Sequence, residues 1–148
     1  MSASDSRTTF ERFLAAINGR EVDAVDVLLH PDFQDQYPQS GELTRGAENI
    51  KAIVRNYPGG YEDLGRTRVV GAEDRWVATP MFTVLRIEGS SNVFTGLQRA
   101  RYPDGSEWYV VVIGEIKDDK VWRVQTLWAP IFDPPPWRAQ WVEVGERP

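Results

Sequence analysis

The sequence contains no cysteine and only one histidine, His30. These absences exclude a disulfide framework, a Cys-based zinc site and a histidine-rich metal cluster. No loop has the spacing of an EF-hand, so we expect neither a metal nor a cofactor. No apolar run approaches the roughly 18 residues needed to cross a bilayer, and residues 1–9 are polar, without the apolar core of a signal peptide. We therefore expect a cytoplasmic protein.

Positive charge is also scarce, with 17 Lys and Arg against 22 Asp and Glu and a net charge of −5. The basic residues form no stripe or tail, which disfavours binding to nucleic acid or to a membrane surface. The length of 148 residues fits one domain, 1–148, with a core of its own. Six tryptophans are many for this length, and they indicate a thick core or an aromatic-walled cavity.

The first 60 residues predict three helices. Around 10–17, apolar residues recur at i, i+3, i+4 and i+7, which is one face of a helix. A second, short helix is expected over 22–29, ending before Pro31. A third is expected over 47–57, where apolar residues again recur at helical spacing.

The remainder predicts strands. Residues 32–42 form a short strand and turn, and from residue 65 onward the chain is rich in β-branched and aromatic residues separated by turn sequences. Long strands with tight turns indicate an antiparallel meander. The fold class is therefore α+β, with three N-terminal helices packed on a strongly curved antiparallel sheet and a Pro/Trp-rich tail, 133–148, packing on the body through Trp137 and Trp141. We place the later strands near 66–71, 75–88, 93–102, 107–117 and 120–130.

The two last hairpins allow the register to be predicted. A bulged turn at 103–105 pairs Arg99 with Tyr109, and a two-residue loop at 118–119 pairs Glu115 with Trp122. We assign the resulting aromatic-rich face to the concave, helix-covered side, and the opposite face to a dimer interface or solvent. A slip of one residue would exchange the two faces. The predicted concave face comprises Leu97, Arg99, Arg101, Glu107, Tyr109, Val111, Ile113, Glu115, Trp122, Val124, Thr126 and Trp128.

Three stretches resemble a known family: FERFLAAINGREVD at 10–23, LLHPDFQDQYPQSGELTRG at 28–46, and EIKDDKVWRVQTLWAP with the tail PPPWRAQWVE within 112–143. The chain resembles the nuclear transport factor 2-like superfamily, in its SnoaL-like branch of small bacterial proteins. The resemblance implies a cone-shaped α+β fold, a pocket between sheet and helices, and a homodimer through the sheet. The fold hosts isomerases, epoxide hydrolases, cyclases, dehydratases and non-catalytic binders, so function must be argued from the site.

The chemistries associated with this family do not transfer directly. The ketosteroid isomerase pattern places its base at Tyr37 and its oxyanion groups at Phe13 and near 111–112, and the limonene-epoxide hydrolase pattern places an Asp at Thr126. None of these positions holds the required group. His30 is interpreted as a residue at a helix C-terminus rather than the acid–base histidine of the cyclase pattern.

A different polar set remains. Asp35, Tyr37 and Gln39 alternate on one strand and could share the pocket face. Asp35 is a candidate base if burial raises its pKa, Tyr37 a hydrogen-bond donor, and Glu115 a second candidate base. Two alternative interpretations stay open: Asp35 could be a solvated residue at the end of its strand, and Glu115 could be a carboxylate at the rim of the pocket. The candidate catalytic residues are therefore Asp35, Tyr37 and Glu115, and the candidate ligand-binding residues are Gln39, Trp76, Arg99, Tyr109, Trp122, Thr126 and Trp128.

Two of these candidates have structural alternatives. Arg99 with Tyr109 could bind a carboxylate or enolate oxygen, or Arg99 and Arg101 could instead pair with Glu107 across the hairpin. Trp76 and its fellow tryptophans could belong to the core.

These observations predict a SnoaL-like pocket protein for a small, mostly apolar or aromatic molecule. It could be a cofactor-free acid–base enzyme of the isomerase, hydrolase or cyclase type. The alternatives are a non-catalytic small-ligand-binding or dimeric accessory protein, and a protein whose cavity is filled by tryptophans.

Overall fold

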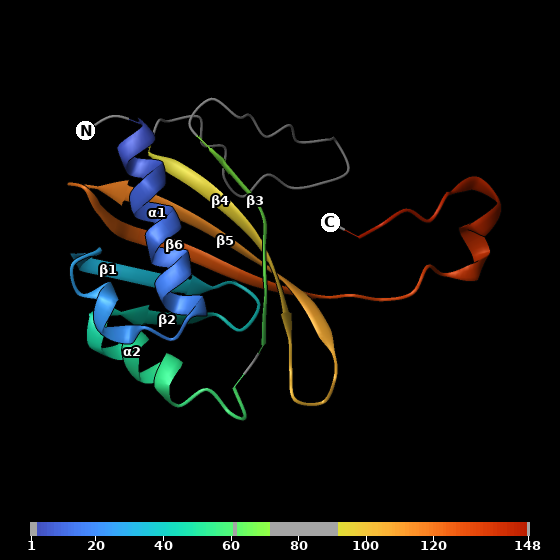
Figure 1. The fold of residues 1–148 in the computed structure, drawn as a ribbon, viewed down its shortest axis with the longest axis horizontal. Coiled ribbons are helices and arrows are strands. Elements are labelled where there is room, and N and C mark those ends of the chain that lie inside the picture. The colour runs from blue at the N-terminus through green and yellow to red at the C-terminus, as the bar shows by residue number, and fades with distance from the viewer. Residues whose placement is uncertain (1–2, 61, 72–91, 148) are drawn as a thin grey trace.

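A computed structural model describes residues 3–60, 62–71 and 92–147. The described part forms one six-stranded sheet in the order β2-β1-β6-β5-β4-β3, with α1 lying across one face and α2 beside β1 and β2 (Figure 1). This arrangement confirms the α+β class. The elements are α1 (Ala3–Asn18), η1 (Val22–Val25), β1 (Leu29–Tyr37), β2 (Glu42–Arg45), α2 (Gly46–Arg55), β3 (Glu62–Gly71), β4 (Val93–Arg101), β5 (Glu107–Lys117), β6 (Lys120–Pro130) and η2 (Pro136–Trp141).

The sheet is mixed rather than antiparallel throughout. The strands β3, β4, β5 and β6 pair antiparallel in that order. The turns at 103–105 and 118–119 predicted the β4–β5 and β5–β6 pairs, whereas β3 pairs directly with β4 and the predicted meander placed strand 75–88 between them. Strand β1 pairs with β6 in parallel, placing Asp35 beside Val124. The antiparallel prediction was wrong here because turn chemistry specifies only local pairings, and β1 joins a strand about ninety positions later in the chain.

The second predicted helix is only one 3-10 turn, Val22–Val25, and β1 begins at Leu29. His30 therefore lies on a strand, and its placement at a helix C-terminus was wrong. Its Nδ1 accepts a hydrogen bond from the Asp32 backbone N–H at 3.0 Å. The pairing of β1 with β6 shifts register between Leu29 and Gln34, and such an irregularity tolerates Pro31, which has no N–H to donate.

The register of the β4–β5 hairpin was predicted correctly, with Arg99 opposite Tyr109. The β5–β6 register was wrong by one residue over most of its length. Ile116 lies opposite Val121, but Glu115 lies opposite Arg123, so Trp122 is the extra residue of a β-bulge. A bulge has no sequence signal as strong as that of a turn. It shifts the pairing of every later residue of β6 with β5 by one position.

This bulge decides which residues face the helices. The predicted concave face is correct for the β6 residues Val124 and Thr126, which are buried, and wrong for β4 and β5. On those strands Gly96 and Gly114 lie beneath α1: a Cβ at Gly114 would stand 2.4 Å from Phe10 Cε2. The helix therefore packs directly on backbone, and a larger residue at Gly114 would force a fully buried ring aside.

The tail does not pack on the body as predicted. Trp137 and Trp141 are each 72% exposed, and Figure 1 shows the segment after β6 extending away from the sheet. The proline run 134–136 favours an extended chain, which continues the direction of β6. The predicted strand 75–88 and its Trp76 lie outside the described residues. No helix in the described part is long and apolar enough to cross a membrane.

Candidate functional site

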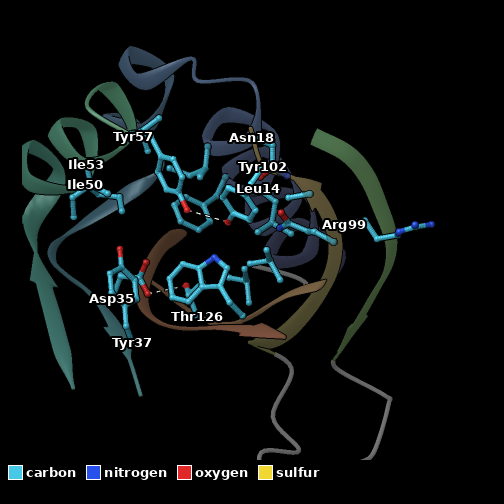
Figure 2. A pocket seen from close by; sticks show the side chains of 18 residues that line it. Leu14, Asn18, Asp35, Tyr37, Ile50, Ile53, Tyr57, Arg99, Tyr102 and Thr126 are labelled. Carbon is cyan, nitrogen blue, oxygen red and sulfur yellow. Dashed lines mark hydrogen bonds between the residues drawn. The ribbon is translucent and has the colours of Figure 1, made fainter. Parts of the chain in front are cut away.

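A cavity of about 100 Å³ lies between the two α-helices and the inner face of the sheet (Figure 2). Its walls are mainly aliphatic and aromatic, with a few polar side chains among them. An apolar space with a small number of convergent polar groups is typical of small-molecule sites. The lining residues are Phe13, Leu14, Ile17, Asn18, Asp35, Tyr37, Ile50, Ile53, Val54, Tyr57, Gln98, Arg99, Ala100, Tyr102, Val110, Val112, Thr126 and Trp128.

Asp35 is the acid of this cavity. It is 5% exposed, and its backbone is held between Thr44 on β2 and Val124 on β6. Burial raises the pKa of Asp35 to about 7, while a hydrogen bond from Thr126 works in the opposite direction. That bond runs from Thr126 Oγ1 to Asp35 Oδ1 over 3.0 Å. A carboxyl group with this pKa exchanges its proton near neutral pH, which is what a general acid–base residue needs.

Tyr37 follows two positions later and lines the same cavity. Its ring meets the Trp128 ring edge to face, at 5.1 Å between centroids and 76° between planes. Burial and the negative charge of Asp35 raise the pKa of Tyr37 to about 12. The hydroxyl therefore stays protonated at neutral pH and can serve as a hydrogen-bond donor.

The side chain of Gln39 forms hydrogen bonds with the backbone of Trp128. Its Nε2 donates to the Trp128 carbonyl at 2.8 Å, and its Oε1 accepts from the Trp128 N–H at 2.7 Å. These two bonds continue the pairing of β1 with β6 beyond the end of β1. Gln39 thus positions the aromatic wall formed by Trp128.

Two tyrosines that sequence reasoning had not placed in the site stand opposite Asp35 in Figure 2. Tyr57 follows α2 and Tyr102 follows β4; their hydroxyl oxygens are 3.0 Å apart, and their rings stack at 6.1 Å. Two residues after Tyr57, Gly59 at φ +67° lies so close to Pro103 that a Cβ would stand 2.8 Å from its Cγ. The segment after α2 is therefore in contact with the segment after β4. No short-range pattern in the sequence connects these two segments.

Gln98 is the second polar group that sequence reasoning missed. It lies on β4, is 5% exposed and lines the cavity, and no residue in the described ranges hydrogen-bonds its side-chain amide. Since its side chain lines the cavity, this amide is suited to a hydrogen bond with a polar ligand atom. The missed signal was the pair Gly96 and Gly114, whose lack of side chains marks the helix-packed face of β4 and β5.

A second, larger space of about 800 Å³ lies outside the cavity; we call it the outer groove. It shares five residues with the cavity, and these form what we call the collar: Tyr37, Ile53, Tyr57, Tyr102 and Trp128. The remaining residues of the outer groove are Gln39, Ser40, Glu42, Pro58, Gly59, Pro103, Asp104, Ser106 and Trp108. A molecule in the cavity would therefore reach the outer groove past the collar.

Other predicted site residues are not brought together. Glu115, Tyr109 and Trp122 line neither space. Arg99 borders the cavity, but Figure 2 shows its guanidinium directed away, and its Nη2 lies 3.2 Å from Glu107 Oε2. The alternative pairing of Arg99 with Glu107 is thereby confirmed. The register error on β5 and β6 explains why these residues were predicted to face inward.

Within the described residues, no group of three or more His, Asp and Glu side chains is placed to hold a metal ion. The polar chemistry of the cavity is therefore carried by one carboxyl group, hydroxyls and amides.

Comparison with known proteins identifies the family. The model of the SnoaL-like domain matches residues 10–124. The chain belongs to the SnoaL-like family. Among curated proteins, none matches.

Solved structures share this SnoaL-like fold. A proposed ketosteroid isomerase from Kribbella flavida DSM 17836 is 22% identical with a TM-score of 0.74, covering 97% of this chain and 92% of that chain. A nuclear transport factor 2-like protein of unknown function from Burkholderia xenovorans LB400 is 26% identical with a TM-score of 0.73, and 99% of each chain is covered. An epoxide hydrolase of M. tuberculosis is 15% identical with a TM-score of 0.60, covering 84% and 83%. These similarities support membership of the nuclear transport factor 2-like superfamily. The reaction has to be argued from the residues of the site.

Proposed function

We propose that this protein is a cofactor-free proton-transfer enzyme for a small, mostly apolar molecule, with Asp35 as its general base. One observation carries the proposal: a carboxyl group that is 5% exposed, with its pKa raised by burial to about 7, on the wall of a largely apolar cavity. Ionised carboxylates are rarely buried without a cation. None of the described residues that line this cavity is a lysine, and the Arg99 guanidinium points away. Such perturbed groups are enriched at functional sites.

The chemistry that fits best is proton removal from a carbon next to a carbonyl group. Asp35 takes the proton, and the electron pair of the broken C–H bond moves toward the carbonyl oxygen. The amide of Gln98 or the hydroxyl of Tyr37 would donate a hydrogen bond to that oxygen. Where a C=C bond stands β,γ to that carbonyl, Asp35 then returns the proton to the γ carbon, the double bond moves to the α,β position and the carbonyl re-forms, so the product is an isomer and the enzyme is regenerated.

The size of the cavity limits the reacting part of the substrate. A cavity of roughly 150 Å³ holds one benzene molecule, and the enclosed space here is about 100 Å³. The part next to Asp35 would therefore be one small ring or a short branched group. Any larger remainder would have to extend past the collar.

The site differs from the ketosteroid isomerase pattern in its donors. The positions where that pattern places oxyanion groups hold Phe13 and Val112, and both line this cavity. A donor from Gln98 on β4 would replace them. This difference favours a substrate other than a steroid, consistent with the small cavity.

Hydrogen–deuterium exchange at carbon tests the proposal without knowledge of the product. A panel of small cyclic ketones and enones would be incubated in D2O at pH 8, and loss of the α-proton signals followed by NMR. The wild type should accelerate exchange of at least one compound over buffer. Asp35→Asn should lower that rate by a factor on the order of 100 or more, while the control Glu115→Gln should keep it. Equal rates for wild type and Asp35→Asn would refute the assignment.

A non-catalytic binding protein is the second candidate function. It is favoured by the replacement of the familiar catalytic positions by Phe13, Val112 and Thr126, all of which line the cavity. In that case Asp35 would donate a hydrogen bond in its protonated form. A ligand that binds wild type and Asp35→Asn with similar affinity, and is recovered unaltered with no α-proton exchange, would support this candidate.

We also propose a homodimer through the outer face of the sheet, in a cytoplasmic protein. Aliphatic side chains on this face are only half-buried in the single chain, among them Leu97, Val111 and Ile113. Their alternation with the helix-packed residues makes the face suited to a second copy. Sedimentation equilibrium would test this: Ile113→Glu should shift the mass from dimer to monomer, and a monomeric wild type would contradict it.

A further inference from the structure

The outer groove combines many aromatic rings with charge of one sign. Five of its lining residues are aromatic, and of the ionised side chains only Glu42 and Asp104 line it, with no Lys or Arg among the described lining residues. The whole chain carries a net charge of −5. A groove of this kind attracts organic cations, because ring faces and carboxylates both favour positive charge. The aromatic residues are Tyr37, Tyr57, Tyr102, Trp108 and Trp128.

The two carboxylates are accessible to solvent. Asp104 is exposed and accepts a hydrogen bond from the Ser106 backbone N–H at 2.8 Å, and its pKa is lowered by the hydrogen bonds from Ser106. Glu42 is exposed at the start of β2. Both side chains can therefore face a cation in solution without a burial penalty.

The groove and the cavity are also joined. The collar residues line both spaces, and inside the collar the amide side chain of Gln98 lines the cavity. A single ligand can thus place an apolar or carbonyl-bearing end in the cavity and a second group in the groove.

We propose that the ligand has two parts: a small apolar ring held in the cavity, and an ammonium group held in the outer groove by Glu42, Asp104 and the aromatic rings. This inference rests on the proposed function for the identity of the inner part. It adds a preference for organic cations over carboxylates in the outer part.

Three probes of similar length, each ending in a ring smaller than benzene, separate the effect of charge: 4-cyclobutylbutylammonium, 4-cyclobutylbutanol and 4-cyclobutylbutanoate. Binding would be followed by quenching of tryptophan fluorescence, since Trp108 and Trp128 line the groove. The ammonium probe should bind about tenfold more tightly than the carboxylate, with the alcohol between them. Equal affinities, a preference for the carboxylate, or no binding of any probe would overturn the proposal.

A matched pair of double variants separates a local site from the overall charge. Glu42→Gln with Asp104→Asn should abolish most of the preference for ammonium while leaving the affinity for the alcohol unchanged. Glu143→Gln with Glu146→Gln removes the same charge from the exposed tail and should keep the preference. Loss of the preference in both pairs would reduce it to a net-charge effect and overturn the assignment to the groove.

A cavity-filling variant tests the two-part arrangement. Ala100 is buried on the cavity wall, so Ala100→Val, or the larger Ala100→Leu, should weaken all three probes by the same factor. Undiminished binding in a folded variant would place the ring outside the cavity and contradict the proposal. These titrations do not depend on catalysis. Preferential binding of the ammonium probe without α-proton exchange in any ketone would refute only the proposed enzyme. Exchange without a preference for the ammonium probe would refute only this inference.

Discussion

The Thr126 hydroxyl donates a hydrogen bond to Asp35 Oδ1 over 3.0 Å, joining two residues that are 91 positions apart in the sequence. The bond crosses from β6 to β1, the one parallel pairing among the described strands. It is the interaction that favours the ionised form of Asp35 against the effect of burial. The protonation of the cavity acid therefore depends on how these two strands are aligned.

Stability should depend on pH through Asp35. Its pKa is about 7 in the folded protein against 3.8 for an unperturbed Asp, so the folded state binds more protons than the unfolded state between these values. The free energy of unfolding should fall as pH rises from about 4 to 7 and level off above. The loss should reach at most about 4 kcal/mol.

Asp35→Asn should remove this dependence, since an amide does not ionise and can still accept the bond from Thr126. The variant should be more stable than the wild type at pH 8 and similar at pH 4, as measured by urea unfolding across that range. Glu143→Gln, an exposed charge removal in the tail, serves as the control. Parallel pH profiles for wild type and Asp35→Asn would contradict the burial of a titrating Asp35.

Removing the Thr126 hydroxyl should shift the pH profile of activity. In Thr126→Val, Asp35 loses the hydrogen bond that favours its ionised form, so its pKa should rise by about one unit. The rate of α-proton exchange, which needs ionised Asp35, should then reach its plateau at higher pH. Thr126→Ser keeps a hydroxyl and should keep the wild-type midpoint. If the midpoint of the pH–rate profile does not move in Thr126→Val, Asp35 is not the group whose ionisation controls the reaction.

Gly114→Ala should destabilise the fold. Its Cβ would lie 2.4 Å from Phe10 Cε2, and Phe10 is fully buried, so helix α1 must shift. Overpacking of this kind costs about 1–3 kcal/mol. Gly145→Ala, where a Cβ meets nothing within 4 Å, should leave the thermal midpoint unchanged. A Gly114→Ala protein as stable as the wild type would show that α1 can move away from the sheet at little cost.

Truncation after Pro134 should leave the stability of the body unchanged within about 0.5 kcal/mol. No residue of η2 is buried, and the hydrogen bond from Arg147 reaches only the carbonyl of Phe132, an exposed residue directly before the tail. Thermal unfolding of the truncated chain is the measurement, with mass determination in parallel. A substantial drop in the midpoint at constant mass would mean that the tail packs on the body.

Local patterns in the sequence determined most of the elements. The 3.6-residue spacing around 10–17 predicted the second half of α1. The turns at 103–105 and 118–119 predicted the β4–β5 register and the β5–β6 hairpin. Asp35 and Tyr37 were correctly expected on one side of their strand, since both line the cavity, because strand alternation is a local property.

Tertiary structure decided the rest of the site. The bulge at Trp122 shifted β6 by one residue, which brought Thr126 to the face of Gln98. The close packing of α1 on Gly96 and Gly114 selected that face for the cavity. The sequence alone determines the strands and the acid, whereas the partners of that acid depend on non-local pairings that no short-range pattern encodes.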